Sequence, residues 1–309
     1  MLDTIFTNGV IAVREKQLLG DKILRFSELS AEEALRALKE SGFGGAEGDG
    51  EDMCRAEEAA LDSFVREYAP SKAELIYLLA PRDFHNAKAL CKSEKLKTDA
   101  GKLLAPEGII KVSDIASAIQ NGEYGKLGAL AGPVKEVMER EDISGAEVGA
   151  IFDRALYSYL FANCGRRGVL KKLITIKVDC TNILTAMRSG TQSHAEKLYL
   201  DGGKLKREEL AEIFGDKAEK ALEDSPYRDF YRVCLEAKEK GQPFTAAEKL
   251  LDSCEAEYFV KKKFELEGKQ PFLYYVFRRR AEISNVRIVL VCLGAGLDAR
   301  EIRGRLRAV

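Results

Sequence analysis

The chain has 309 residues, of which 46% are hydrophobic and 32% are charged. Its 49 basic and 50 acidic residues leave a formal net charge of −1, which argues against a nucleic-acid coat protein and against a polybasic membrane-surface protein. At about 150 residues per domain, the length predicts roughly two to three domains.

The sequence offers little material for a metal or redox site. The seven cysteines are scattered, so that no two of them form a Cys-x-x-Cys pair, and an odd set of isolated thiols fits a reducing compartment. His85 and His194 are the only histidines, too few for a His-based metal site. We therefore expect no metal and no cofactor.

The N-terminal residues do not resemble a signal peptide, because Asp3 stands where positive charge is usual and no apolar segment follows. The longest uncharged apolar run, residues 288–297, is about ten residues long, whereas a membrane-spanning helix needs roughly 17–25. We expect no membrane span, so that contact with a membrane passes through another protein.

Helix signals follow one another along the chain and predict an all-α fold. Capping boxes, in which a Ser, Thr or Asp precedes a Glu by three residues, mark helix starts. They lie at Ser30, Ser71, Ser144 and Thr245, with a weaker one at Asp298. The glycine-rich acidic stretch 42–52 is the best linker candidate. Only residues 173–178, LITIKV, look strand-like, and the repeat described next predicts that they are helical.

Three features recur in the same order about 91 to 103 residues apart, which indicates a triplicated unit. The first is an Asp followed six residues later by a Tyr: Asp62 and Tyr68, Asp153 and Tyr159, Asp252 and Tyr258. The second is an acid three residues before an Asn: Asp83 and Asn86, Asp179 and Asn182, Glu282 and Asn285. The third is an acid within an aliphatic motif: Ile110-Asp114-Ile115, Leu205-Glu209-Leu210, Leu297-Glu301-Ile302.

The repeat predicts units at 47–142, at 143–240 and at 241–309 together with 1–46. The first two units end in an aromatic tail, at Tyr124 and Tyr227, and the third block lacks one. Residues 30–44, which end in Phe43-Gly44, resemble that tail. Our hypothesis is that residues 1–46 complete the third unit and bring the two ends of the chain together.

The repeated acids have two interpretations. Residues three apart lie on one helix face, so each acid and its Asn can bind the same neighbouring segment as a polar clasp that fixes helix register. A catalytic carboxylate pair would instead need convergent acids whose pKa values differ. Threefold repetition favours the scaffold interpretation. We interpret the repeated tyrosines as core or interface aromatics.

Arg278, Arg279 and Arg280 form the densest cationic point, within a C-terminal stretch, 261–309, that carries twelve basic and five acidic residues. They precede Glu282 and indicate either a solvated face with one intramolecular ion pair or a docking site for acidic groups of a protein partner, since arginine binds carboxylates bidentately. Nucleic-acid binding is disfavoured, because the neighbouring aromatics lie on an apolar helix without a recognisable binding module.

Several segments resemble the C subunits of bacterial and archaeal V-type (A-type) ATPases and ATP synthases, which are related to the eukaryotic V-ATPase d subunit. The resemblance covers essentially the whole chain. It is carried by residues 83–90 (DFHNAKAL), by 178–184 (VDCTNIL) with Arg188, by the run from 271–275 (PFLYY) through Glu282 and Asn285 to Glu301-Ile302-Arg303, and by Arg14.

The resemblance implies three similar helical domains around a pseudo-threefold axis that form a funnel. It also implies a part without catalytic activity, which couples the membrane proteolipid ring to the central stalk of a rotary motor. Its partners would be the ring and the stalk subunits, and its place the cytoplasmic side of the membrane, as a peripheral subunit that is a monomer in isolation.

Two other classes of function stay open at this point. A helical adaptor outside any rotary motor would use the repeats as a scaffold and bind soluble partners. A hydrolase would bring the repeated acids together in one pocket, and Asp179→Asn would then abolish turnover.

Overall fold

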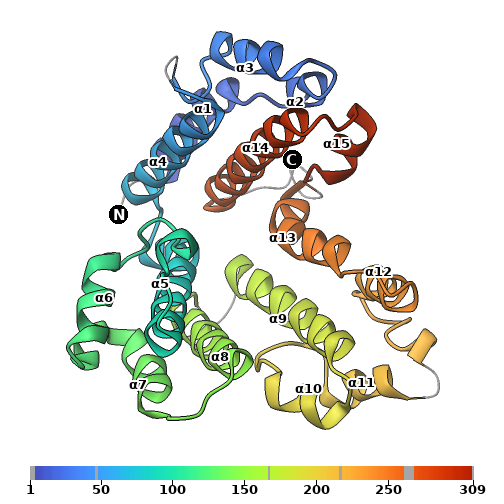
Figure 1. Cartoon of the computed structure of the whole chain (residues 1–309). Coiled ribbons are helices and arrows are strands. Elements are labelled where there is room, and N and C mark those ends of the chain that lie inside the picture. The colour runs from blue at the N-terminus through green and yellow to red at the C-terminus, as the bar shows by residue number, and fades with distance from the viewer. Residues whose placement is uncertain (1–3, 46–47, 166–167, 216–217, 261–267, 308–309) are drawn as a thin grey trace. The chain divides into compact units, whose positions relative to one another are not determined.

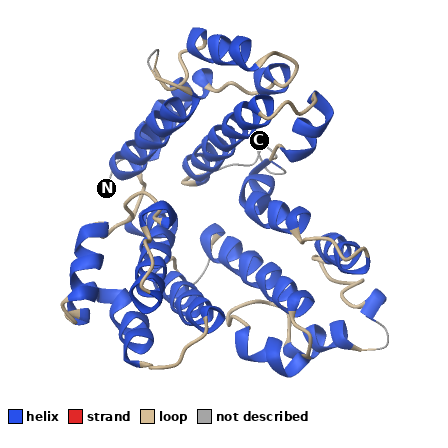
Figure 2. Cartoon of the chain, in the orientation of Figure 1, coloured by secondary structure: helices blue, strands red, loops and turns tan. Residues whose placement is uncertain are grey.

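The fold is all-helical, as the sequence predicted. The computed structural model describes residues 4–45, 48–165, 168–215, 218–260 and 268–307, and every regular element in these ranges is a helix (Figure 2). The strand-like residues 173–178 lie inside helix α9 (Val169–Arg188). Tertiary burial of an apolar helix therefore overrides the β-propensity of this segment.

The chain forms two compact units. Unit 1 comprises Met1–Lys72 together with Asp252–Val309, and unit 2 comprises Ala73–Leu251. Unit 1 thus joins the first part of the chain to the last. The division into three repeat units at the predicted boundaries stays a prediction.

Unit 1 is built around helix α14 (Gln270–Gly294). Helices α1 (Thr4–Arg14), α2 (Lys22–Phe26), α3 (Ala31–Glu40), α4 (Gly50–Tyr68) and α15 (Ala299–Arg305) all pack against it (Figure 1). The second half of α13 (Thr245–Val260) belongs to the same unit, and a 3-10 turn, η1 (Glu15–Gln17), follows α1. In the core the Phe64 ring stacks on that of Phe272, with 5.6 Å between centroids. Residues at opposite ends of the sequence therefore share one core.

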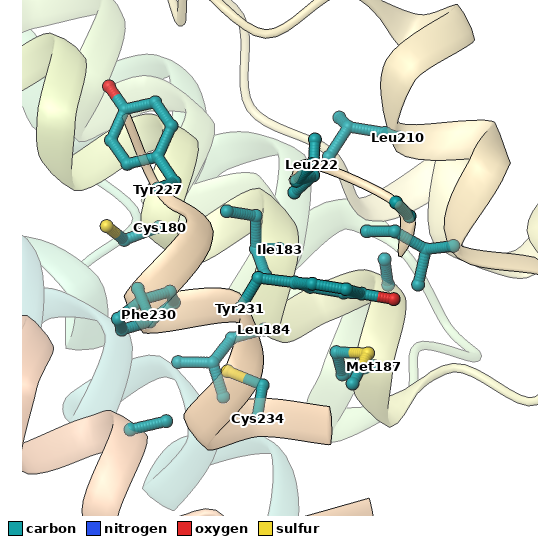
Figure 3. Close-up of a cluster of buried hydrophobic side chains, with 14 of the residues drawn as sticks. Cys180, Ile183, Leu184, Met187, Leu210, Leu222, Tyr227, Phe230, Tyr231 and Cys234 are labelled. Carbon is teal, nitrogen blue, oxygen red and sulfur yellow. The ribbon is translucent and has the colours of Figure 1, made fainter. Parts of the chain in front are cut away.

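Unit 2 contains two hydrophobic cores. Its helices are α5 (Lys72–Leu96, from its second residue), α6 (Val112–Gln120), α7 (Ala131–Glu139), α8 (Gly145–Asn163), α9, α10 (Gln192–Leu198), α11 (Arg207–Ala211), α12 (Arg228–Glu239) and the start of α13. Short 3-10 turns are η2 (Gly101–Leu103), η3 (Tyr124–Leu130), η4 (Glu212–Phe214) and η5 (Ala218–Lys220). Phe84 and Phe152 belong to the first core, and Ile183 and Tyr231 to the second (Figure 3).

Local sequence sets several helix starts where the capping signals predicted them. Ser30, Ser144 and Asp298 each cap a helix, with the reciprocal hydrogen bonds of a capping box at α3, α8 and α15. The predicted linker 42–52 is shorter than expected, because Asp49 caps α4 and Gly50 already begins the helix. Acidic residues in a first turn are stabilised by the helix dipole, so an acidic stretch can end as a helix start.

Within the described ranges, no helix combines the length and the hydrophobicity that a membrane crossing requires. The expectation that the chain lacks a spanning helix agrees with this observation for that part of the sequence.

Burial protects the cysteine thiols from reaction. All but Cys254 are buried, and desolvation raises the pKa of Cys54 to about 11 and those of Cys91, Cys164 and Cys234 to about 12. The thiolate is the reactive form, so these side chains are inert at neutral pH.

We therefore predict that a thiol reagent at pH 7.5 labels one cysteine rapidly in the folded protein and the others only after unfolding. Cys254→Ser is expected to remove the rapid phase, as followed by absorbance of the released chromophore. Rapid labelling of several cysteines in the folded protein would contradict this packing.

Candidate functional site

The repeated acids and asparagines are buried on the second helix of each predicted unit, α5, α9 and α14. Their exposed fractions range from 0 to 3%: Asp83, Asn86, Asp179, Asn182, Glu282 and Asn285. Polar side chains removed from water to this degree need hydrogen-bond partners, and their partners define what they do.

Each asparagine binds both backbone groups of a single residue in a following loop. The side-chain amide donates to that residue's carbonyl, and the side-chain oxygen accepts from its N–H. The pairs are Asn86 with Ala105 (3.2 and 2.8 Å), Asn182 with Leu200 (2.9 and 2.8 Å) and Asn285 with Arg307 (3.0 and 2.8 Å). An asparagine used in this way replaces a backbone partner and fixes the loop against the helix.

Each acid accepts hydrogen bonds from two consecutive backbone N–H groups. Asp83 accepts from Ile109 and Ile110 (2.9 and 3.1 Å), Asp179 from Lys204 and Leu205 (3.0 and 3.1 Å), and Glu282 from Leu19 and Gly20 (2.5 and 3.1 Å). We call each acid, its asparagine and the backbone they bind a polar clasp. In all three clasps the acid accepts from two consecutive N–H groups, as the scaffold interpretation requires, although both bind a single oxygen, Oε1, in Glu282.

The third clasp shows that the third repeat feature was placed at the wrong residues in the last unit. Leu297-Glu301-Ile302 was aligned with Ile110 and Leu205, whose backbone is held by the clasp acids. Instead Leu297 precedes α15, which leads to Arg307, the residue that Asn285 holds. The backbone at Leu19 and Gly20, from the start of the chain, occupies the place that the alignment gave to Leu297.

The side chain of each clasp acid is short or long according to the residue that precedes the two N–H groups it binds. Asp is found where that residue is Gly, and Glu where it is Leu. A Cβ atom added at Gly108 would lie 2.2 Å from Asp83 Oδ1, and one at Gly203 would lie 2.1 Å from Asp179 Oδ1. In the third clasp this position is Leu18, which carries a Cβ, and the acid is Glu282, one methylene longer than Asp. The two glycines, 25 and 24 residues after their acids, are structural positions of the clasps that the sequence pattern did not indicate.

The Asp and Tyr positions of the first repeat feature lie outside the clasps. The Lys88 ammonium is 3.1 Å from Asp153, and the Arg307 guanidinium is 3.1 Å from Asp252. The half-buried Asp62 lies on α4. The tyrosine rings pack on neighbouring phenylalanines, Tyr68 on Phe64 (5.0 Å between centroids), Tyr159 on Phe84 (5.9 Å) and Tyr258 on Phe259 (5.3 Å).

Ion pairs join the second helix of one predicted unit to the first helix of the next. Lys88 on α5 pairs with Asp153 on α8, and Arg188 on α9 pairs with Glu248 on α13. Arg287 on α14 pairs with Glu51 (2.8 Å) and Glu58 (3.0 Å) on α4. The hydrogen bonds that Arg287 donates to these two carboxylates raise the pKa of Arg287, and they lower the pKa of Glu51.

The three consecutive arginines have different environments. Arg279 is only 7% exposed, lies 2.6 Å from Glu57, binds Glu282 and stacks over the Phe43 ring. Burial alone would lower its pKa, but the two carboxylates raise it, so the guanidinium stays charged.

The burial of Arg279 does not fit the predicted docking role, because its donors already bind carboxylates of the same chain. Arg278, with its guanidinium 5.9 Å from the Tyr274 ring centroid, and Arg280 are half-buried. For these two arginines an interface role stays a prediction.

The clasp geometry leaves the hydrolase interpretation without support. Every carboxylate oxygen of Asp83, Asp179 and Glu282 accepts a hydrogen bond from its own clasp or from Arg279. None of the three lines the cavity of about 470 Å³ in unit 1. In the described part of the chain, no three His, Cys, Asp or Glu side chains gather as metal ligands would.

Comparison with known families identifies the family to which the chain is similar. A sequence profile of the family described as ATP synthase (C/AC39) subunit matches residues 7–305, a range that includes the acid and the asparagine of each of the three clasps. No curated protein sequence matches the chain significantly.

The clasps make a specific prediction about stability. Asp179→Ala leaves the N–H groups of Lys204 and Leu205 and the Tyr227 hydroxyl without their acceptor, and we expect a loss of at least about 2 kcal/mol in urea unfolding. The matched control is Asp201→Ala, whose side chain is 92% exposed and whose loss is expected to cost less than about 1 kcal/mol. Equal effects of the two substitutions would contradict the assignment.

The glycine at the second clasp gives an independent prediction. Gly203→Ala places a Cβ against Asp179, and we expect it to lower the free energy of unfolding by about 1–3 kcal/mol. Gly190→Ala, where a Cβ would meet nothing within 4 Å, is expected to be neutral or slightly stabilising. Urea unfolding of both variants at one pH measures the difference, and a neutral Gly203→Ala would show that the loop has room to move.

Proposed function

Because the chain belongs to the ATP synthase (C/AC39) subunit family, we propose that it is a non-catalytic rotor subunit of a V-type rotary ATPase. In this proposal it is the socket that couples the membrane proteolipid ring to the central stalk. Membership of the family makes it a subunit of such a complex, and the role as a socket is the step that we add.

The observation that carries this proposal is the threefold clasp. Three helices that are far apart in sequence bear an acid three residues before an Asn, and each pair binds backbone N–H and carbonyl groups. Ion pairs link α5 to α8, α9 to α13 and α14 to α4 in turn. Each of these ion pairs lies within one compact unit. Three similar domains around a pseudo-threefold axis that form a funnel are part of the proposal, as the resemblance to the family implies.

A coupling part has to be stiff. One charge moved through 100 mV releases about 2.3 kcal/mol, and several such steps must be gathered for one ATP. The joint between ring and stalk must therefore carry elastic strain without slipping. Clasps suit this task, since each fixes a loop to a helix through four or more hydrogen bonds away from water.

The proposed partners are the proteolipid ring and the central-stalk subunits. The chain would lie on the cytoplasmic face of the membrane as a peripheral subunit and would be a monomer in isolation. Exposed and half-buried basic side chains of its C-terminal third, among them Arg278 and Arg280, would contribute to polar contacts with these partners.

Purification from native membranes tests the proposal. The tagged chain, extracted with a mild detergent, is expected to bring down the ring proteolipid and the stalk subunits, identified by mass spectrometry. Exclusive recovery of soluble proteins would instead favour the helical adaptor. A second tagged preparation that carries Arg278→Glu and Arg280→Glu tests the arginine contacts, and recovery equal to the wild type would remove them from the interface.

A further inference from the structure

The loop between α5 and α6 exposes apolar side chains to solvent. Leu103 is 64% exposed and Ile109 is 43% exposed, and Pro106 between them is exposed as well. We call residues 101–111 the first clasp loop, because it contains the backbone that the first clasp binds. The loop and the part of α5 that holds it belong to unit 2, so this surface is a property of one compact body.

Three side chains from one turn of α5 hold this loop in place. The contacts are the His85 ring with the Leu103 carbonyl (2.8 Å), Asn86 with both backbone groups of Ala105, and Asp83 with the N–H of Ile109 (2.9 Å). Because residues 83–86 span about one helical turn, Leu103 and Ile109 lie beside the same part of the helix. Their backbone is already ordered, so a partner that binds here does not have to order the loop.

The second clasp provides an internal comparison, because its loop has the same length and the same backbone contacts. Ile109 and Lys204 each donate an N–H to the Oδ2 atom of their clasp acid, at 2.9 and 3.0 Å. Each also lies four residues after the residue that the clasp asparagine holds. The second loop has Lys204 where the first has Ile109, and Asp201 where the first has Pro106. The clasp therefore accepts charged side chains at both positions, and the fold does not require apolar ones there.

Leu103 also differs from its counterpart. The residue two positions before the one that the asparagine holds is Leu103 in the first clasp and Leu198 in the second, and Leu198 is half-buried. His85, whose ring holds the Leu103 carbonyl, stands where the other two clasps have Thr181 and Ser284. The first clasp loop therefore combines a more exposed leucine with an additional contact that fixes it.

The charges around the first clasp loop cancel, which indicates the kind of partner that fits. Residues 98–114, together with Arg82 on α5, carry three cations and three acids: Arg82, Lys102, Lys111, Asp99, Glu107 and Asp114. An anionic bilayer or a nucleic acid is held by an excess of cations, which this surface lacks. An exposed apolar centre with a rim of both charges is the composition of a protein–protein contact.

We propose that the first clasp loop is a docking surface for another protein, which packs apolar side chains such as Leu, Ile or Phe against Leu103 and Ile109. The contact removes apolar surface from water on both sides, and a loop that is already held in place loses little freedom when it forms. The proposal rests on the proposed function only for the identity of this protein, which would be a ring or stalk subunit.

Photocross-linking in the purified complex tests the contact directly. The full-length chain carries a benzophenone side chain at position 109, and ultraviolet light joins that group to C–H bonds in contact with it. We expect position 109 to be joined to a ring or stalk subunit at a peptide that contains apolar residues, and the matched position of the second loop, 204, to give no such product. Absence of a partner cross-link from position 109 would overturn the proposal.

Exchange of residues between the two loops tests it without a cross-linker. Ile109→Lys combined with Leu103→Gln is expected to reduce recovery of the partner about fivefold or more, whereas Lys204→Ile is expected to leave it unchanged. Because the second clasp already accommodates a lysine at this position, the urea unfolding midpoint of Ile109→Lys is expected to equal that of the wild type. Leu103→Gln alone, at an exposed position, is a further variant. Undiminished recovery with both the combined and the single variant would overturn the proposal.

Two measurements on the isolated chain separate other occupants of this surface. With vesicles of phosphatidylserine and phosphatidylcholine, we expect the chain to stay in the supernatant, and co-sedimentation that Leu103→Gln abolishes would overturn the proposal in favour of a membrane surface. In sedimentation velocity we expect a monomer, and a dimer that the same substitution dissociates would overturn the proposal in favour of a second copy of the chain.

This proposal and the proposed function fail in distinguishable ways. If ring and stalk subunits are recovered equally by the wild type and by the loop variants, the function stands and the docking surface does not. If position 109 is joined to an identified protein outside any rotary motor and the loop variants lose that protein, the docking surface stands and the proposed function is wrong.

Discussion

A carboxylate removed from water must be given hydrogen-bond donors, and this chain meets that demand in the same way three times. Two successive backbone N–H groups, which a loop would otherwise expose to solvent, satisfy each acid. The arrangement is reciprocal, because the loop needs an acceptor as much as the helix needs donors. Removing either partner leaves a buried polar group unpaired at roughly 1–3 kcal/mol, so helix and loop positions depend on each other.

The third clasp extends this dependence to the two ends of the chain. Glu282 and Leu19 are 263 residues apart in sequence, yet they form a hydrogen bond in the core of unit 1. Arg303 pairs with Glu28 across a similar separation. Closing so long a loop has an entropic cost that grows only slowly with length, so several contacts of this kind suffice to hold the N-terminal helices on α14. Unit 1 therefore contains residues from both the first and the last part of the chain.

Much of this architecture could be predicted from the sequence because it depends on local or repeated signals. Capping boxes at Ser30 and Ser144 were correct, and the repeat correctly made 173–178 helical against its composition. The prediction failed where the partner is distant in sequence. The Leu297 alignment was wrong because the matching backbone, at Leu19, comes from the other end of the chain. The burial of Arg279 was missed because Glu57, its partner, lies 222 positions away.

Arg279 and Arg14 differ in the groups that their guanidinium ions contact. Both guanidinium groups lie over a phenylalanine ring at about 5 Å and line the same cavity. Arg279 has two carboxylates of its own chain, so its charge stabilises the fold. Arg14 packs its guanidinium on the Phe64 ring at the end of α1. The physical demand that a cation withdrawn from water be paired thus binds α14 to α4 inside unit 1.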